Sequence, residues 1–228
     1  MIGVQYLMAN QTMKRCRAVA ALTILALLGA CRNPQAQLPN RANLTAAVND
    51  YLAQRGHLCL AKYDWPITVT AVDQQARSLD AQQMPVLEAL GLATGRAVGV
   101  PRKATDGNTV ALAAREYALT AEGRKYYLHV PVVIATATRR VTHPADFCAA
   151  TLSLDRVVGW EKPQALDGHT VTSVLFTYKI VPASWTQTAD ARRVFPVVTH
   201  AVENAGTLQL RLGVHLTQRG WIADELSE

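Results

Sequence analysis

The C-terminal half of the chain carries a hydrophobic pattern that is typical of strands. The segment "TLQLRLGVHL" places leucine or valine at every second position from Leu208 to Leu216, with polar or small residues between them. Such alternation indicates a strand with one face on a core and the other in water. Further segments rich in β-branched residues, which strands favour, lie at 128–141, 150–163 and 169–181.

Two other stretches have helical character. The segment "TADARRVFPVVTHAVENAG", residues 188–206, predicts a helix that breaks at Pro196 and ends at Gly206. Near the other end of the chain, residues 44–55 carry an apolar face, and we expect Asn43 to cap a helix there. A strand, "ITVTAV", is expected at 67–72. The pattern therefore predicts an α+β fold whose C-terminal half is an antiparallel sheet packed with a helix.

An apolar run from Ala18 to Ala30, interrupted only by Thr23, precedes these elements. It is shorter than the roughly 20 residues that a membrane-spanning helix needs. Three basic residues stand between positions 14 and 17, directly before the run. A basic segment followed by a short apolar segment and small residues is typical of a secretion signal.

The end of the run indicates how the signal is removed. Ordinary signal peptidase prefers a small residue three positions before the cut, where cleavage after Ala30 would place Leu28. The sequence Leu28-Gly29-Ala30-Cys31 instead resembles the lipobox of bacterial lipoproteins. This resemblance implies that Cys31 receives a lipid and becomes the first residue of the mature chain. With Arg32 next, it also implies an outer-membrane location facing the periplasm.

The middle of the chain holds a second resemblance, over residues 80–127. "MPVLEALGLATG" and "REYALTAEGRKYY" are separated by a turn-rich segment, "VPRKATDGNT". Gly91 is suited to the left-handed turn that ends a helix, and Thr120 to capping a short turn. The pattern resembles the later part of a winged-helix domain of MarR-type regulators, and the matching positions are Leu87, Leu90, Gly91, Leu92, Leu119, Thr120, Glu122, Gly123 and Arg124.

This resemblance extends to shape and not to DNA binding. The helix that would read DNA, 80–90, contains Gln82, Gln83, Asp80 and Glu88 but no lysine or arginine. Base and phosphate contacts depend on such basic side chains. We therefore expect no nucleic-acid partner.

Taken together, the patterns divide the chain into four parts. The segment "RNPQAQLPNRAN" offers little to bury and is interpreted as a tether. The expected parts are a signal peptide over 1–30, a lipidated cysteine and tether over 31–43, a helical, winged-helix-like part over 44–128, and an antiparallel sheet with a helix over 129–228.

Charge and cysteines are consistent with this location. The chain has 23 Lys and Arg against 17 Asp and Glu, and removal of the signal leaves 20 against 17. So small a surplus indicates a solvated surface, or contact with anionic lipid or peptidoglycan. Loss of Cys16 and lipidation of Cys31 leave Cys59 and Cys148, for which we expect a disulfide that ties the two halves together; two buried free thiols are the alternative.

Motifs for chemistry are missing from the sequence. It contains no Gly-rich phosphate loop, no H-E-x-x-H and no G-x-S-x-G, and its six histidines are scattered, so we expect no catalytic residues, metal or cofactor. Trp65 in "YDWP" and Trp160 in "VGWEKP" are the most distinctive aromatic residues. They are expected either to pack beside the disulfide or to share a groove that binds a partner protein or glycan.

Three hypotheses for function remain. The favoured one is a lipid-anchored, periplasm-facing binding or accessory module of the Gram-negative envelope, without catalysis. The second is a periplasmic enzyme whose site forms only in the fold, from Asp64, Glu161 and a histidine. The third is a winged-helix nucleic-acid binder with a misread leader.

Overall fold

The computed structural model describes residues 34–105 and 107–226, so the predicted signal peptide and Cys31 lie outside the described part. A short 3-10 helix, η2 (Pro34–Gln37), leads into the first long helix, α2 (Arg41–Arg55). The cap of α2 is Asn40, whose side chain accepts a hydrogen bond from the backbone N–H of Asn43 at 2.9 Å. The predicted cap at Asn43 is therefore wrong. Of the predicted tether over 31–43, the described residues form η2 and the start of α2 and contact the body.

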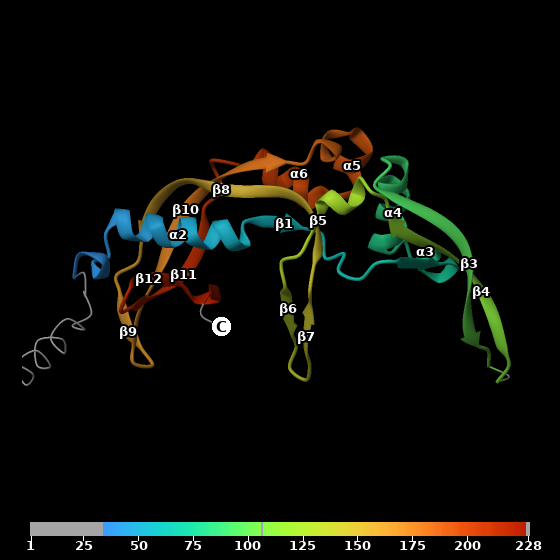
Figure 1. Ribbon diagram of the computed structural model, residues 1–228, viewed down its shortest axis with the longest axis horizontal. Coiled ribbons are helices and arrows are strands. Elements are labelled where there is room, and N and C mark those ends of the chain that lie inside the picture. The colour runs from blue at the N-terminus through green and yellow to red at the C-terminus, as the bar shows by residue number, and fades with distance from the viewer. Residues whose placement is uncertain (1–33, 106, 227–228) are drawn as a thin grey trace, which may run out of the picture.

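A large antiparallel sheet forms the body at this end of the molecule (Figure 1). Its strands lie in the order β1 (His57–Cys59), β8 (Asp146–Trp160), β10 (His169–Pro182), β11 (Leu210–Thr217) and β12 (Gly220–Ala223). Two short strands pair at its margins, β5 (Tyr127–Leu128) with β8 and β9 (Gln164–Leu166) with β10. The predicted α+β class with an antiparallel C-terminal sheet is confirmed.

Helix α2 covers this sheet and builds a core with it. The apolar face of the helix packs on strands that lie more than 100 residues further along the chain. The predicted alternation in β11 is confirmed for Leu212 and Val214, which are buried, whereas Leu208 precedes the strand and is 40% exposed. The fully or nearly buried members of this core include Leu44, Ala47, Val48, Leu52, Val174, Phe176 and Trp221.

A smaller three-stranded sheet forms the other end. Its strands lie in the order β2 (Ile67–Thr70), β4 (Thr109–Leu119) and β3 (Ala93–Lys103), with α3 (Ala71–Gln75) and α4 (Leu79–Ala89) between β2 and β3 in sequence. Strand β2 ends two residues before the predicted boundary. The reason is that Thr70 caps α3 by a reciprocal capping box with Asp73.

The predicted turn at Gly91 is present, since this glycine has φ +72° and follows α4. Helix α4 is followed by the long β3–β4 hairpin, which ends at Leu119; the winged-helix resemblance itself stays a prediction. Pro85 lies inside α4.

The second core joins this small sheet to C-terminal helices. Buried residues of β2, α4 and β4 pack with Phe147 of β8 and with η4 (Ser184–Gln187), α5 (Ala189–Val194) and α6 (Pro196–Glu203). The predicted break at Pro196 is confirmed. The helix was predicted to end at Gly206, but α6 ends at Glu203 and Gly206, at φ +78°, lies in the turn that follows. Helix α5 packs on α4, so the C-terminal helices contact the part that contains the small sheet as well as the large sheet. The predicted boundary at residue 128 stays a prediction.

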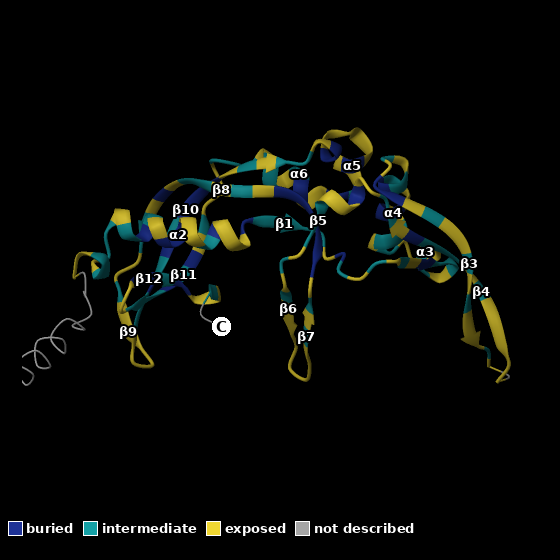
Figure 2. Cartoon of the chain, in the orientation of Figure 1, coloured by how far each residue is buried: buried dark blue, intermediate teal, exposed yellow. Residues whose placement is uncertain are grey.

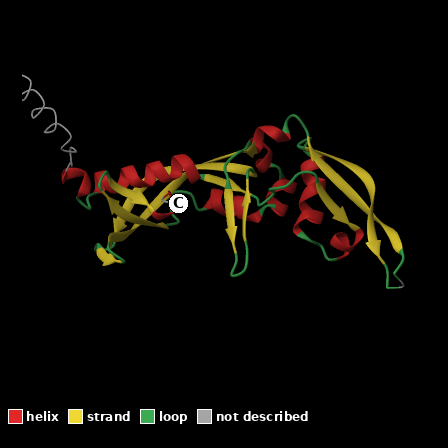
Figure 3. Ribbon diagram, turned by 60° about the horizontal axis from the view of Figure 1, so that its bottom comes forward, coloured by secondary structure: helices red, strands yellow, loops and turns green. Residues whose placement is uncertain are grey.

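The described part of the chain has the shape of an arch, with the large sheet at one end and the small sheet at the other (Figure 1). Strands β8 and β10 run along this arch, and one hydrophobic core lies toward each end (Figures 1 and 2). Three hairpins project from the arch to the same side in both views: β9–β10, β3–β4, and β6–β7, which is formed by Val132–Ala135 and Arg140–His143 (Figures 1 and 3).

The helices in the described ranges are all too short or too polar to span a membrane.

Candidate functional site

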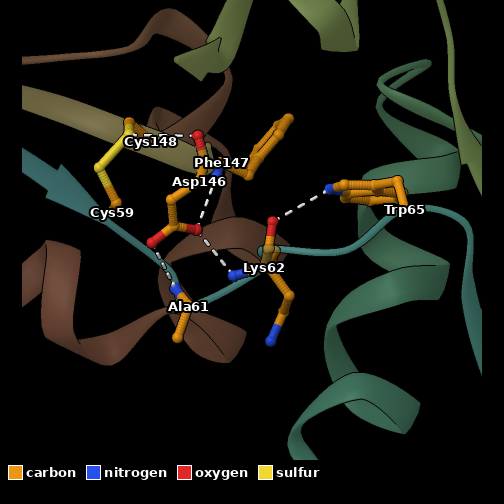
Figure 4. The surroundings of a disulfide bond; sticks show 7 residues. All are labelled: Cys59, Ala61, Lys62, Trp65, Asp146, Phe147 and Cys148. Carbon is orange, nitrogen blue, oxygen red and sulfur yellow. Dashed lines mark hydrogen bonds between the residues drawn. A yellow bond between two sulfur atoms is a disulfide. The ribbon is translucent and has the colours of Figure 1, made fainter. Parts of the chain in front are cut away.

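A disulfide joins Cys59 of β1 to Cys148 of β8, 89 positions apart, as predicted (Figure 4). The two cysteines are also register partners in the sheet. Before the disulfide, α2 belongs to the core of the large sheet; after it, Leu60 packs against the core of the small sheet. The bond therefore holds the chain where it passes from one core to the other.

Asp146 is a buried carboxylate beside the disulfide (Figure 4), only 4% exposed. Its Oδ1 accepts hydrogen bonds from the backbone N–H groups of Lys62 and Phe147, both at 2.7 Å, and its Oδ2 accepts one from Ala61 at 3.1 Å. Burial raises the pKa of Asp146, although these hydrogen bonds and the charge of Lys62 act in the opposite direction. The carboxylate thus fixes the turn by which the chain leaves β1. The sequence pattern did not single out this residue.

Trp65 lies within the same turn region. Its indole N–H donates to the carbonyl of Lys62 at 3.2 Å, and its ring lies 6.0 Å from that of Phe147, centre to centre. This corresponds to the structural alternative, in which the "YDWP" segment packs beside the disulfide.

Trp160 lies at the other end of β8, in the core that contains α2. The guanidinium of Arg41 stands 6.0 Å from the centre of its ring. Cys148 and Trp160 are 12 positions apart on one strand, which corresponds to about 40 Å of extended chain. The structure therefore does not bring Trp65 and Trp160 together: Trp160 does not pack beside the disulfide, and the two rings cannot share a groove.

The acidic residues of the enzyme hypothesis are separated in the same way. Asp64 lies 3.2 Å from Nδ1 of His143, whose ring stacks on Tyr63. Glu161 forms an ion pair with Arg211 of β11, at the other end of β8. A further histidine, His215, lies 2.8 Å from Asp224 near His169. Among the described residues, no three histidine, cysteine or acidic side chains are grouped to hold a metal ion.

The polar residues of α4 take part in contacts within the protein. Asp80 pairs with Lys62 at 2.8 Å, and Gln83 donates to the carbonyl of Val194, the last residue of α5, at 2.9 Å. Glu88 binds Arg115 of β4 at 2.6 Å, and this hydrogen bond holds the pKa of Glu88 below its usual value. A reading helix would need these side chains free to face DNA.

In the described structure, the β6–β7 hairpin combines strand edges that pair with no further strand and exposed aliphatic side chains. Within the described part of the chain its two strands pair only with each other, so neither outer edge is paired with a further strand. Val133 and Ile134, on opposite faces of β6, are 40% and 38% exposed. The sequence pattern indicated strand character over 128–141, and the structure divides this segment into two strands separated by four residues.

A groove lies between this hairpin and the body. It is lined by side chains of β6 and β7 together with Arg55 at the end of α2 and Glu225 near the C-terminus. The guanidinium of Arg55 donates to the carbonyl of Pro131 at 2.9 Å and so ties the base of the hairpin to α2. An open strand edge, exposed aliphatic side chains and a charged groove thus adjoin one another.

We also compared the chain with models of protein families, with curated proteins and with solved structures. None of these comparisons found a match.

Proposed function

We propose that this protein is a lipid-anchored, periplasm-facing binding or accessory module of the Gram-negative outer membrane, without catalysis of its own. The observation that carries the proposal is the β6–β7 hairpin, with two open edges and with Val133 and Ile134 exposed. An isolated two-stranded hairpin is only marginally stable in water, and open edges are templates for strand addition. A partner that adds a strand would satisfy both the edge and the aliphatic side chains.

The proposed location is supported by two features at different places in the chain. The sequence Leu28-Gly29-Ala30-Cys31 resembles a lipobox and follows a signal-like segment. The disulfide between Cys59 and Cys148 is consistent with a compartment outside the cytoplasm.

Lipidation is tested by changing the proposed acceptor. We expect Cys31→Ala to abolish incorporation of labelled fatty acid and to leave a slower-migrating, uncleaved precursor. Cys16→Ala is the matched control, because that cysteine lies within the proposed signal, and this variant should be labelled normally. Unchanged labelling of the Cys31 variant would contradict the lipoprotein proposal.

Partner binding is tested by capture from envelope extract, followed by mass spectrometry. The Val133→Asn/Ile134→Asn variant should lose the partner that the wild-type protein retains. The control is Val181→Asn/Val197→Asn, which alters two valines that are 70% and 55% exposed outside the hairpin. Equal capture by both variants would show that the hairpin is not the binding surface; capture of peptidoglycan fragments instead of a protein would identify the partner as a glycan.

Nucleic acid is not the proposed partner, since Asp80, Gln83 and Glu88 of α4 are held in contacts within the protein. In a titration at physiological salt, specific binding of one duplex more tightly than about 10⁻⁷ M would contradict this, since non-specific binding lies at about 10⁻⁴–10⁻⁶ M.

A further inference from the structure

The distance between the proposed lipid anchor and the folded body is very short. Pro34, the first residue of η2, is three positions after Cys31. Three residues of fully extended chain span at most about 11 Å. The headgroup layer of one leaflet is itself about 5–8 Å thick, so a lipid on Cys31 keeps η2 at or near the headgroups.

We infer that the end of the arch around η2 rests directly on the phospholipid headgroups, as a defined membrane-contact surface. This inference rests on the proposed lipidation of Cys31. The occupant is the lipid surface in which the anchor itself is inserted, because the chain between them is too short to hold the body away.

Helix η2 is fixed to the large sheet and does not act as a spacer. The indole N–H of Trp221 in β12 donates to the carbonyl of Gln37 at 3.2 Å. The side-chain amide of Asn43 donates to the carbonyls of Gln35 and Leu38 at 2.7 and 2.8 Å. Gly220 lies so close that an added Cβ would stand 3.1 Å from the carbonyl oxygen of Ala36. Only the residues before Pro34 can therefore act as a spacer between the lipid and the folded body.

Two turns of the large sheet, β9–β10 and β11–β12, lie at the same end of the arch as η2 (Figure 1). Gln37 lines one cleft together with His169, at the start of β10, and with Thr217 and Gln218, between β11 and β12. The β9–β10 turn follows Leu166, which is 58% exposed, and Leu38 behind η2 is 47% exposed. Leucines at a membrane surface gain free energy by entering the headgroup and acyl boundary.

Exposed basic side chains flank these leucines. Arg219 lies in the β11–β12 turn and Lys162 precedes β9, and both are exposed. Cations next to apolar side chains are suited to lipid phosphates, each contributing roughly a fivefold change in binding at an anionic surface. We call Leu38, Leu166, Lys162 and Arg219 the membrane-contact surface.

This orientation leaves the rest of the arch outside the lipid. The β3–β4 hairpin stands at the end of the arch opposite η2, and β6–β7 lies between them (Figure 1). The membrane-contact surface and the proposed partner-binding hairpin are therefore separate, which allows each to be altered without the other.

The experiment uses a chain that begins at Cys31. Residues 34–226 contain both cores and the disulfide, and Cys31 is then the one thiol outside the disulfide. This thiol is coupled to a maleimide lipid in vesicles that contain brominated phospholipid, so that the lipid is at residue 31 whether or not cells place it there. Failure of the contact is thereby distinguished from failure of lipidation in cells.

Tryptophan reporters then measure proximity to the lipid, with the native fluorescence subtracted. We expect Leu166→Trp to lose about half or more of its added emission, since contact residues lie about 5–10 Å into the headgroup and acyl boundary. Val197→Trp is the matched control, because Val197 is similarly exposed at 55% but lies on α6, and it should be unaffected.

An insertion variant tests the cause. A flexible insert of about 20 Gly and Ser residues before Pro34 spans about 25 Å and should remove most of the quenching. Equal quenching of the Leu166 and Val197 reporters, or no quenching of either, would overturn the inference. Strong quenching of an Ile134→Trp reporter would also overturn it, because the arch would then lie with its hairpins on the membrane.

Discussion

Removal of the disulfide tests how the two cores are coupled. The perturbation is Cys59→Ala/Cys148→Ala in a chain of residues 32–228. Alanine is chosen because Cys148 is 5% exposed, and a serine hydroxyl buried there would add a cost of its own. The bond closes a loop of 89 positions between the end of β1 and the start of β8.

The expected loss follows from this separation. In the chain-entropy account, a disulfide that closes a loop of that length adds about 4.6 kcal/mol to the free energy of unfolding at 25 °C. For a chain of this size, each kcal/mol corresponds to roughly 2–4 °C in the unfolding midpoint, so we expect a fall of about 9–18 °C. Because the bond lies where the chain passes between the cores, its loss is also expected to separate one transition into two.

Calorimetry of the wild-type and double-alanine proteins, with and without reductant, measures both effects. Reductant should lower the wild-type midpoint to that of the variant and leave the variant unchanged. A midpoint within about 3 °C of wild type, below the roughly 4–8 °C that a loss of 2 kcal/mol would produce, would refute the coupling argument. Recovery of both cysteines as free thiols from exported protein would refute the pairing itself.

Three further predictions concern single side chains. Asp146→Asn should lower the free energy of unfolding by about 1–3 kcal/mol, since an amide NH₂ would face a backbone donor. The pKa of Asp146 is raised in the fold, so its protonated form favours the folded state. The difference in the free energy of unfolding between wild type and this variant should therefore be greatest below the ordinary carboxyl pKa and decrease as pH rises through the raised value. Urea titrations at about pH 3 to 7 measure this difference. Leu87→Ala and Leu44→Ala, one in each core and both fully buried, should each cost about 2–5 kcal/mol by urea unfolding; a loss under 1 kcal/mol would contradict that core. Gly220→Ala, at φ +123° and close to Ala36, should cost about 1–3 kcal/mol and speed hydrogen exchange in η2, and unchanged exchange would contradict the packing of η2.

The elements that were predicted well from the sequence are those whose pattern is local. Alternation identified β10 and β11, and Pro196 marked the boundary between two helices. The start of β8 was missed because residues 146–150 are all buried, so no alternation marks them. The start of α3 had a visible signal in Thr70 and Asp73, a capping-box spacing that was read as part of a strand.

The parts of the candidate site that depend on tertiary contacts were not predictable in this way. Apolar periodicity shows that a helix has a buried face but not which sheet covers it, so the packing of α2 on β12 was not foreseen. The role of Asp146 arises from three backbone donors that only the fold brings together. The two cysteines could be paired because few thiols remained, whereas Trp65 and Trp160 had no comparable constraint.

The packing of α2 on β12 has a consequence for the order in which an exported chain assembles. In the proposed export, helix α2 would leave the membrane machinery well ahead of Leu212, Val214 and Trp221, which belong to the same core. Non-local contacts of this kind fold slowly, and a partly exported chain exposes the apolar face of α2 until they form. Loss of the last strand should therefore expose the end of the protein nearest the proposed anchor, although that end is made first.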